Sequence, residues 1–419
     1  MESFIIEGGN KIFGKVNISP AKNACLPIIA SSLAFPTKIF LKKAPRIKDV
    51  CAMADIVKSL GGSYTFDDNG LTLENENINS FEGDKQIYGS VRASLFSAGA
   101  LLARFKKAVI PFPGGCNIGS RPVDIHIDAL KALGADVRCL KDVLEIDGSN
   151  MRCGYVKLRF PSVGATVNAI SAAIFLNGET VVSNAAKEPE IIDLCYFLNT
   201  LGCKVYGGGT SVVRIQGVNR ESFDKVSYKP VFDRIEAGTF MLCCLAIGGE
   251  LSFDVECFKP IESVSKICAE CGAETGFSNG TFYMRMKKKP LSVNCVADVY
   301  PAFPSDLQPQ LVASLIMGKG KSFVYDKVFP ERFSYLKELL KFGAKADFLN
   351  GGARICGVKK LKAANVVVPD LRAGAALCIA ALSAEGSSVI ERADIIRRGY
   401  MNFDEKLRML GCKIVHNFN

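Results

Sequence analysis

Apolar and polar positions along the chain alternate between two kinds of helical segment. In the first kind almost every position is apolar or small, which is typical of a helix buried on all sides. Five such segments occupy residues 24–33, 163–176, 237–247, 307–317 and 373–384. In the second kind the apolar positions follow the helical period on one face, as in residues 191–198, and this predicts a surface helix. Short β-branched stretches such as residues 180–182 predict strands.

A glycine between an apolar and a small residue recurs six times, at Gly61, Gly134, Gly202, Gly272, Gly343 and Gly411. The successive intervals are 73, 68, 70, 71 and 68 residues. Because an amphipathic segment precedes each glycine, we expect each one to end a helix. The regular spacing predicts six copies of one unit, made of a buried helix, a strand, a surface helix and two strands.

Six repeats predict an α/β (α+β) protein with two domains of three repeats each, since 419 residues exceed what one core usually holds. We expect one domain to cover residues 22–229 and the other to combine residues 1–21 with residues 230–419. The strands expected near residues 4–6 and 15–18 should both complete the last repeat. The chain then crosses twice between the domains, which favours a ligand-binding cleft between them.

Composition argues against several classes of protein. Hydrophobic residues make up 48% and charged residues 22% of the chain, as in an ordinary globular protein. The longest uncharged run contains Pro, Asn and Gly, so we expect no membrane span, and the N-terminus resembles no secretory signal. Sixteen cysteines scattered through apolar segments are typical of reduced thiols, which predicts a cytoplasmic protein.

Metal and nucleic-acid sites are poorly supported. Cys268 and Cys271 form a CxxC pair, but no second pair stands at zinc spacing, and His126 and His416 lie far from it in sequence. The net charge of +10 is spread along the chain, and its densest run, residues 287–289, is typical of a solvated loop. We therefore expect no metal and no nucleic-acid partner, and small anionic substrates explain the charge better.

The most distinctive polar stretch covers residues 113–126. Its three glycines allow close approach of a ligand, and Pro122 suits the first turn of a helix that should run to residue 133. A helix N-terminus beside Arg121 is suited to bind phosphate or carboxylate. Cys116 would ionise more readily in such a place and could donate a proton or attack a substrate.

Charged residues also stand at the expected starts of the buried helices, where a buried segment does not require them. They are Lys22, Arg92, Asp306, Asp370 and Arg372. Basic groups around a carboxylate suit group transfer from a small polyanion, because the cations bind the anion and the carboxylate accepts a proton. Plainer interpretations stay open: helix caps for both aspartates, rim charges for Lys22 and Arg372, an exposed turn at residues 397–399, and an inert thiol at Cys116.

Seven motifs carry a resemblance to a known family. They are Ala21-Lys22-Asn23-Ala24, the loop of residues 113–126, Ser162-Val163-Gly164-Ala165-Thr166, residues 184–190, Phe303-Pro304-Ser305-Asp306, Asp370-Leu371-Arg372-Ala373 and Arg398-Gly399-Tyr400. Over essentially its whole length the chain resembles the enolpyruvyl transferases, and among them the UDP-N-acetylglucosamine 1-carboxyvinyltransferases. The resemblance implies an inside-out α/β barrel in two domains. It also implies transfer of enolpyruvyl from phosphoenolpyruvate to the sugar 3-hydroxyl, the first committed step of peptidoglycan biosynthesis, without cofactor or metal.

The resemblance further implies roles for individual residues. Cys116 would donate a proton to phosphoenolpyruvate and would be the thiol that fosfomycin alkylates, while Asp306 would accept the proton of the hydroxyl. The catalytic residues would be Cys116, Asp306, Lys22 and Arg398. Phosphoenolpyruvate would contact Lys22, Asn23, Arg121, Arg372 and Arg398. UDP-N-acetylglucosamine would contact Asn23, Arg92, Arg121, Pro122, Val123, Asp124, Ile125, Ser162, Val163, Gly164, Asp306 and Val328.

Two positions depart from the family pattern. Pro20 stands where relatives usually have a glycine, which restricts the chain at the expected domain crossing. Phe160-Pro161 replaces a Lys-Val pair of many relatives, so one expected contact to the diphosphate is in question.

Two rival functions remain within reach of the same fold. One is a transferase like 5-enolpyruvylshikimate-3-phosphate synthase, which the cysteine-bearing loop disfavours. The other is a non-catalytic paralogue that binds the UDP-sugar and regulates the pathway. Intact Lys22, Cys116, Asp306 and Arg398 disfavour that paralogue.

Overall fold

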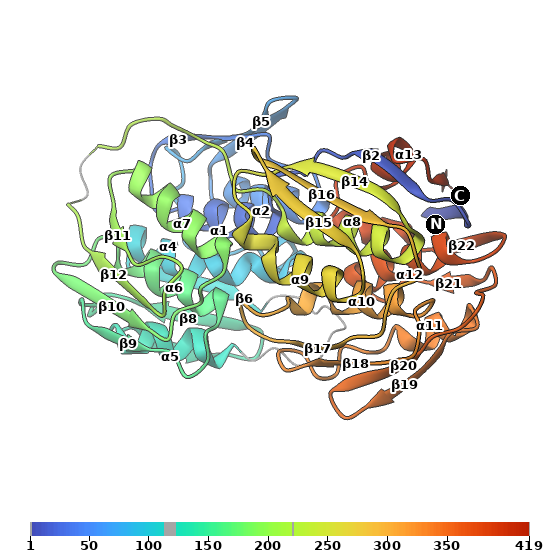
Figure 1. Ribbon diagram of the computed structural model, residues 1–419. Coiled ribbons are helices and arrows are strands. Elements are labelled where there is room, and N and C mark those ends of the chain that lie inside the picture. The colour runs from blue at the N-terminus through green and yellow to red at the C-terminus, as the bar shows by residue number, and fades with distance from the viewer. Residues whose placement is uncertain (1, 113–122, 220–221, 419) are drawn as a thin grey trace. The chain divides into compact units, whose positions relative to one another are not determined.

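The computed structural model describes residues 2–112, 123–219 and 222–418. These residues form two compact units, and Figure 1 labels their elements. The N-terminal unit contains the described residues from Pro20 to Val231. The C-terminal unit contains those up to Ser19 together with those from Phe232 onward.

Three helices form the core of the N-terminal unit: α1 (Lys22–Ser32), α4 (Ser97–Phe105) and α6 (Val163–Ala173). Nearly all of their side chains are buried, as their apolar sequences predict. Helices α4 and α6 approach so closely that a Cβ atom on Gly99 would lie 2.3 Å from the carbonyl oxygen of Asn168. A hydrogen bond of 2.7 Å joins the hydroxyls of Ser31 and Ser171 across α1 and α6.

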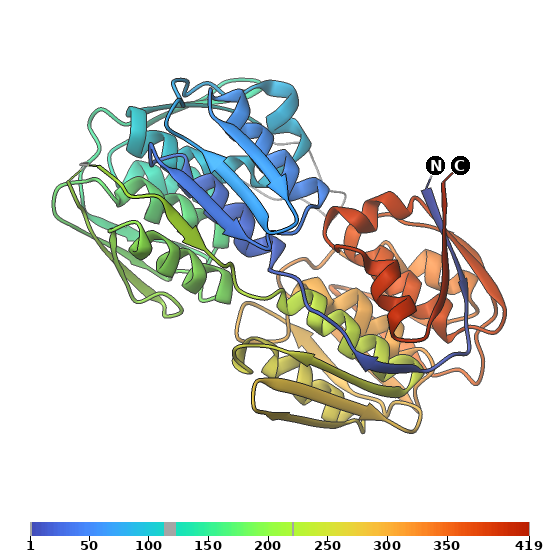
Figure 2. The same cartoon turned by 90° about the horizontal axis from the view of Figure 1, so that it is seen from above.

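Sheets and amphipathic helices surround this core (Figure 2). The helices are α2 (Lys48–Ser59), α3 (Lys85–Ser90), η1 (Arg92–Phe96), α5 (Asp124–Ala132) and α7 (Pro189–Thr200). The strands are β3 (Lys38–Lys42), β4 (Ser63–Asp67), β5 (Gly70–Glu74), β6 (Lys107–Pro111), β7 (Asp136–Cys139), β8 (Val143–Asp147), β9 (Tyr155–Lys157), β10 (Glu179–Ser183), β11 (Lys204–Tyr206), β12 (Val212–Gln216) and β13 (Val226–Tyr228). They form three sheets with the orders β13-β3-β5-β4, β6-β8-β7 and β11-β12-β10-β9.

The C-terminal unit repeats this plan around α8 (Arg234–Ile247), α10 (Gln308–Leu315) and α12 (Leu371–Ser383). Its outer helices are η2 (Lys259–Ile261), α9 (Glu262–Glu270), η3 (Ser305–Leu307), α11 (Leu336–Lys341), η4 (Ala393–Arg398) and α13 (Phe403–Met409). Its strands are β1 (Glu2–Glu7), β2 (Ile12–Lys15), β14 (Gly249–Asp254), β15 (Glu274–Ser278), β16 (Thr281–Met286), β17 (Asn294–Ala297), β18 (Lys321–Asp326), β19 (Lys345–Leu349), β20 (Gly352–Cys356), β21 (Asn365–Val367), β22 (Ser387–Glu391) and β23 (Lys413–Phe418). Three sheets have the orders β15-β16-β14-β2, β17-β18-β20-β19 and β21-β22-β1-β23.

The two N-terminal strands separate, so one expectation for them was wrong. Strand β1 lies between β22 and β23, antiparallel to both, and completes the last repeat as predicted. Strand β2 begins at Ile12 and pairs in parallel with β14, in the fourth repeat. The partner of β2 is set by a pattern of strand pairing between repeats, which the local sequence does not reveal.

In each sheet the strand that follows the buried helix also pairs in parallel with a segment of another repeat. Strands β9, β13, β17 and β21 make such pairs with β10, β3, β18 and β22, and Glu82 forms a single parallel bridge to Val109 of β6. The additional strand always comes from the preceding repeat of the same unit. The last repeat of a unit supplies the strand for the first one. Since β1 ends the sixth repeat, β2 must serve the fourth.

The six helix-ending glycines are confirmed: Gly61, Gly134, Gly202, Gly272, Gly343 and Gly411 have φ between 82° and 103°. This left-handed backbone favours glycine. With buried helices inside and open sheets outside, the chain is the α/β protein of two three-repeat units that the sequence predicts. Across the described ranges, no helix is both long and apolar enough to cross a membrane.

Candidate functional site

Asp306 lies in the C-terminal unit between two buried arginines. Its Oδ1 accepts a hydrogen bond of 2.8 Å from Arg332 Nη1, and its Oδ2 accepts one of 3.0 Å from Arg372 Nη2. The arginine side chains are 4% and 3% exposed, whereas that of Asp306 is 26% exposed. Two buried cations therefore hold the Asp306 carboxylate at their border with solvent.

The two aspartates that stand at the starts of buried helices differ in whether they act as helix caps. Asp370 caps α12, because its Oδ1 accepts hydrogen bonds from the backbone N–H groups of Arg372 and Ala373. Asp306 is the N-cap residue of neither η3 nor α10, which have Pro304 and Leu307 at that position. Its carboxylate faces the two arginines instead, which favours a chemical role for Asp306 and a structural one for Asp370.

The guanidinium of Arg372 lies over the ring of Tyr400, with 5.3 Å between Cζ and the ring centroid. Burial opposes the charge of Arg372, but the Asp306 carboxylate, Tyr400 and Asp233 together outweigh burial and raise the pKa of Arg372. The Tyr400 hydroxyl is 2.9 Å from Thr239 Oγ1 and accepts a hydrogen bond of 3.1 Å from Gln310 Nε2. Burial raises the pKa of Tyr400, so its hydroxyl stays neutral and available to this network.

Arg398 ends η4, two residues before Tyr400, and its side chain is partly exposed. The neighbouring Arg397 pairs with Glu2 of β1 at 3.4 Å, and Glu2 also lies 3.2 Å from His416 Nε2. The 3-10 helix η4 is thus tied to the central strand of its sheet. Arg398 belongs to the same unit as Arg372, and η4 packs against α12, which begins next to Arg372.

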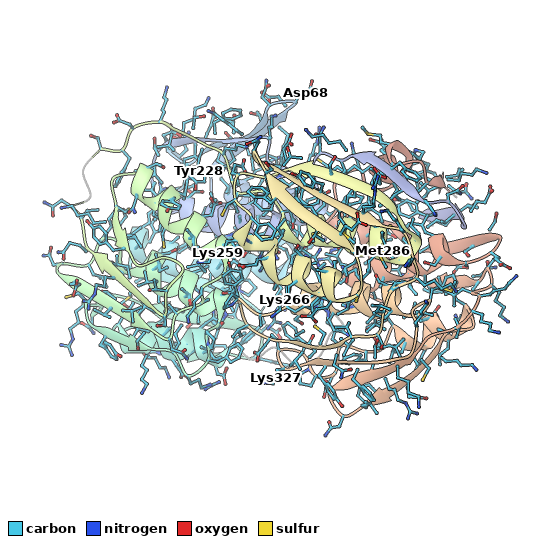
Figure 3. The ribbon with its side chains drawn as sticks, viewed as in Figure 1. Asp68, Tyr228, Lys259, Lys266, Met286 and Lys327 are labelled. Atoms are coloured by element: carbon cyan, nitrogen blue, oxygen red, sulfur yellow. The ribbon has the colours of Figure 1, made fainter. Side chains whose placement is uncertain are left out.

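Val328 follows β18 in a tight turn built on Asp326. Asp326 accepts hydrogen bonds from Val328 N at 2.9 Å and Phe329 N at 2.8 Å, and from the hydroxyl of Ser305 at 2.5 Å. Burial raises the pKa of the Asp326 carboxyl. Lys327, labelled in Figure 3, has an exposed side chain 3.5 Å from Asp298 and marks the outer side of this turn.

Two more charged residues at a buried helix start are structural. Asp233 caps α8 through the N–H groups of Ile235 and Glu236. Glu236 pairs with Lys406 at 2.6 Å, with both side chains almost fully buried, and accepts a hydrogen bond from Ser19 N. This pair anchors the end of the N-terminal segment within the C-terminal unit.

In the N-terminal unit Lys22 and Asn23 begin α1. The Lys22 ammonium lies 3.0 Å from Asp49 Oδ2 in the first turn of α2, and the two side chains are 10% and 12% exposed. A lysine on the rim of the unit would be far more exposed, so the rim interpretation does not hold for Lys22. An ammonium kept at a helix start is suited to bind an anion.

The start of α6 meets α5 and η1 around His126. Ser162 caps α6 by accepting a hydrogen bond from Ala165 N at 3.3 Å, and Val163 and Gly164 form its first turn. A Cβ atom on Gly164 would lie 2.5 Å from Cε1 of His126, so only glycine fits there. Burial, together with the charge of Arg92 in η1, lowers the pKa of His126 to about 4.

Val123, Asp124 and Ile125 open α5. The Asp124 carboxylate pairs with Arg159 Nη2, and Arg159 Nη1 reaches Asp128 at 3.2 Å. The hydrogen bond from Arg159 lowers the pKa of Asp124. Arg159 directly precedes the Phe160-Pro161 pair.

Three predicted site residues, Cys116, Arg121 and Pro122, lie outside the described residues. The fifteen described cysteines are free thiols. Cys268 and Cys271 are buried around the end of α9, and burial raises the pKa of both. No group of His, Cys, Asp and Glu among the described residues has the arrangement of a metal site.

Residues 6–407 match the family described as EPSP synthase (3-phosphoshikimate 1-carboxyvinyltransferase). This chain belongs to the enolpyruvyl transferase family. Similar family members include UDP-N-acetylglucosamine 1-carboxyvinyltransferase 2 of Carboxydothermus hydrogenoformans, 41% identical over 99% of both chains. The enzyme numbered 1 from that organism is 39% identical over 99% of this chain and 98% of its own. A relative named UDP-N-acetylglucosamine 1-carboxyvinyltransferase from Trichlorobacter lovleyi is 36% identical over 99% of both chains.

Solved enolpyruvyl transferases share the fold. The enolpyruvyl transferase NikO from Streptomyces tendae superposes with a TM-score of 0.89 over 99% of both chains, at 20% identity. EPSP synthase from Acinetobacter baumannii gives 0.73 over the whole of both chains, at 16% identity. These structures support the architecture, and the resemblance drawn from the sequence motifs to enolpyruvyl transferases is confirmed.

Sequence reasoning about this enolpyruvyl transferase missed Arg332, Asp49 and Asp326. Charges at the starts of buried helices and on glycine loops can be recognised in the sequence, but these three residues stand elsewhere. Arg332 follows a turn, Asp49 opens a surface helix, and Asp326 ends a strand. Each contacts a predicted residue or its neighbour only through the tertiary fold.

Proposed function

We propose that this chain transfers the enolpyruvyl group of phosphoenolpyruvate to the 3-hydroxyl of UDP-N-acetylglucosamine, the first committed step of peptidoglycan biosynthesis. The sugar oxygen bonds to C2 of phosphoenolpyruvate and loses its proton, while C3 gains a proton. The tetrahedral adduct then loses a proton from C3, its C2–O bond to phosphate breaks, and phosphate leaves. Atoms and charges balance without a cofactor or metal.

The carboxylate of Asp306 between Arg332 and Arg372 is the observation that carries the proposal. A carboxylate that faces two guanidinium groups is ionised but accepts a proton poorly while both pairs persist. When the anionic donor substrate binds Arg372, that pair weakens. Asp306 then becomes a better base for the sugar hydroxyl at the moment the reaction needs one.

The remaining roles follow the resemblance. Lys22, Arg121 and Arg398 hold the phosphate in this proposal, Arg372 lies near the carboxylate of phosphoenolpyruvate, and Cys116 is the proton donor. The nearly buried ammonium of Lys22 supports the first of these roles, since it leaves a strong charge with little competing water.

The sugar nucleotide is proposed to bind Arg92 and three groups of residues. They are Asn23, the stretch 121–125, and residues 162–164. Asp306 and Val328 complete the set. These proposed contacts come from residues of both units.

The names of the relatives support the sugar-nucleotide substrate over shikimate 3-phosphate. Relatives at 36–41% identity over nearly the whole chain are named for UDP-N-acetylglucosamine, whereas the EPSP synthase structure is only 16% identical. The two numbered enzymes of one organism are almost equally similar to this chain, so identity favours neither form. We further propose that the enzyme works in the cytoplasm, since its described cysteines are free thiols. We also propose that it has no nucleic-acid partner, since its basic residues are spread along the chain.

Phosphate release tests the proposal. Wild-type protein should release phosphate from phosphoenolpyruvate only when UDP-N-acetylglucosamine is present, and fosfomycin should abolish the release by alkylating Cys116. Release with shikimate 3-phosphate instead would establish the rival transferase. A wild-type rate no higher than that of the Cys116→Ala, Asp306→Ala double variant would establish the non-catalytic paralogue. Undiminished release after treatment with EDTA is expected for a reaction without metal.

A further inference from the structure

Asp326 is a buried carboxylate at the end of β18, only 2% exposed, and the proposed reaction gives it no role. Its Oδ1 accepts two backbone hydrogen bonds, from Val328 N at 2.9 Å and Phe329 N at 2.8 Å. Its Oδ2 accepts the hydroxyl of Ser305 at 2.5 Å. One carboxylate thus joins Ser305 to a turn that begins 21 residues later in the chain.

Both segments lead to the same pair of charged groups. Ser305 directly precedes Asp306, and the turn of Val328 and Phe329 leads to Arg332, whose N–H bonds to the Phe329 carbonyl at 3.0 Å. Arg332 returns to Asp306 Oδ1 at 2.8 Å and to the Ser305 carbonyl at 3.4 Å. The contacts therefore form a closed ring from Asp326 through Ser305, Asp306 and Arg332 back to Asp326.

The turn alone does not require a buried carboxylate. Asp67, at an exposed hairpin, accepts the N–H groups of Asn69 and Gly70 at 2.8 and 3.0 Å, in the same two- and three-residue spacing. Asp67 makes this turn in water, where its charge costs little. Burial of a carboxylate such as that of Asp326 is unfavourable unless other contacts compensate for it. The additional hydrogen bond from Ser305 is such a contact.

We propose that Asp326 is a positioning residue that fixes the Asp306 carboxylate relative to Arg332 and Val328. The inference rests on the proposed function, in which Asp306 accepts the hydroxyl proton and Val328 contacts the sugar nucleotide. Loss of the Ser305 contact lets η3 shift against the turn. Small displacements of a base from its proton lower the rate of the chemical step far more than they weaken binding.

Four variants test the inference: Asp326→Asn, Ser305→Ala, their combination, and Asp326→Glu. Asp67→Asn is the matched control, because it makes the same chemical change in the same kind of turn. Steady-state rates of phosphate release with both substrates give kcat and KM, and thermal melting shows whether each variant is folded. Ser305→Ala leaves the turn and its carboxylate in place, so it tests the contact even if Asp326→Asn folds poorly.

Asp326→Asn and Ser305→Ala should each lower kcat about 10- to 100-fold, with the KM for phosphoenolpyruvate changed less than about threefold. The double variant should be no slower than the slower single one, since both break one contact. Asp326→Glu should recover part of the rate, and Asp67→Asn should match wild type.

Two results overturn the inference alone, given an active wild type. One is a kcat for Asp326→Asn and Ser305→Ala equal to that of Asp67→Asn. The other is losses that multiply in the double variant. A wild-type protein that releases no phosphate with both substrates overturns the proposed function and this inference together.

Discussion

The ammonium of Lys22 lies 3.0 Å from the carboxylate of Asp49, and the two side chains are only 10% and 12% exposed. This pair joins the start of the buried helix α1 to the first turn of the surface helix α2. A lysine kept so far from water retains its position because a carboxylate faces it.

Replacing Asp49 with Asn should therefore impair both stability and substrate binding. We expect a loss of about 1–3 kcal/mol in the free energy of unfolding, measured with urea, because a nearly buried ammonium loses its partner. The KM for phosphoenolpyruvate should rise about tenfold as Lys22 becomes mobile. The exposed pair of Lys38 and Glu74, at 2.8 Å, gives the control: Glu74→Gln should change stability by less than about 1 kcal/mol and leave KM unaltered. Equal effects of the two substitutions would contradict the prediction.

The stacking of Arg372 on Tyr400 predicts that ring and hydroxyl have separable functions. Tyr400→Phe keeps the ring but removes a buried hydrogen-bond group, so we expect a loss of about 1–2 kcal/mol in stability and little change in KM for phosphoenolpyruvate. Tyr400→Leu also removes the ring face, and the KM should then rise several-fold because Arg372 loses a contact of about 0.5–2 kcal/mol.

Tyr88 provides the control for this pair. Its hydroxyl accepts a hydrogen bond from Ser97 at 3.3 Å, and its side chain is as fully buried as that of Tyr400. Tyr88→Phe should reduce stability by a similar amount, and Tyr88→Leu should leave KM at the wild-type value. A rise in KM for Tyr88→Leu as large as for Tyr400→Leu would mean that general loosening, and not the stacked ring, explains the result.

Prediction of the fold succeeded where the causes are local in sequence, and it failed where they are not. A few neighbouring residues determine both the helical periodicity and the left-handed glycine at each helix end. The six repeats could therefore be predicted from sequence. The partner of β2 depends on β14, which follows more than two hundred residues later. Nothing in residues 12–15 distinguishes that edge from another, because strand pairing is set by the whole unit.

The same distinction applies to the candidate site. Asp306 and Asp370 both precede buried helices, and the sequence left both open as caps or as chemical groups. Asp370 caps a helix, whereas Asp306 accepts a hydrogen bond from Arg332, which lies in a separate turn. Arg332 has no motif of its own in the local sequence, so this outcome depends on packing that only the tertiary structure supplies.

Arg159 is expected to act on substrate binding and hardly on stability. It pairs with Asp124 and Asp128 on the surface, where such pairs contribute little, so Arg159→Ala should change the free energy of unfolding by less than about 1 kcal/mol. Asp124 is a predicted contact of UDP-N-acetylglucosamine, and its freed side chain should raise the KM for that substrate several-fold. Arg214 pairs with Glu179 at the same exposures of 54% and 48%, so Arg214→Ala is a matched control with no expected change in KM. An unchanged KM for Arg159→Ala would show that the pair is merely a surface contact.

His126 makes a pH dependence of stability predictable in sign. Asn168 donates one amide hydrogen to the Leu95 carbonyl at 3.0 Å and the other to His126 Nδ1 at 2.9 Å, so the imidazole is neutral with its proton on Nε2. The folded pKa of about 4 lies below the usual 6.5, because burial and Arg92 disfavour the imidazolium. Between these values the unfolded chain binds a proton that the folded chain does not, so stability falls as pH falls from about 6.5 to about 4.

The loss attributable to His126 should reach at most about 3 kcal/mol at pH 4. Urea unfolding of wild type and of His126→Gln at intervals between pH 7 and pH 4 measures it. Across this window the free energy of unfolding should fall more for wild type than for the variant. Above pH 7 it should change with pH equally in both proteins, because the ring is neutral in the folded and the unfolded chain. Parallel curves for the two proteins would mean that the ring can take up its proton in place, for example by turning away from Gly164, and that burial does not hold it neutral.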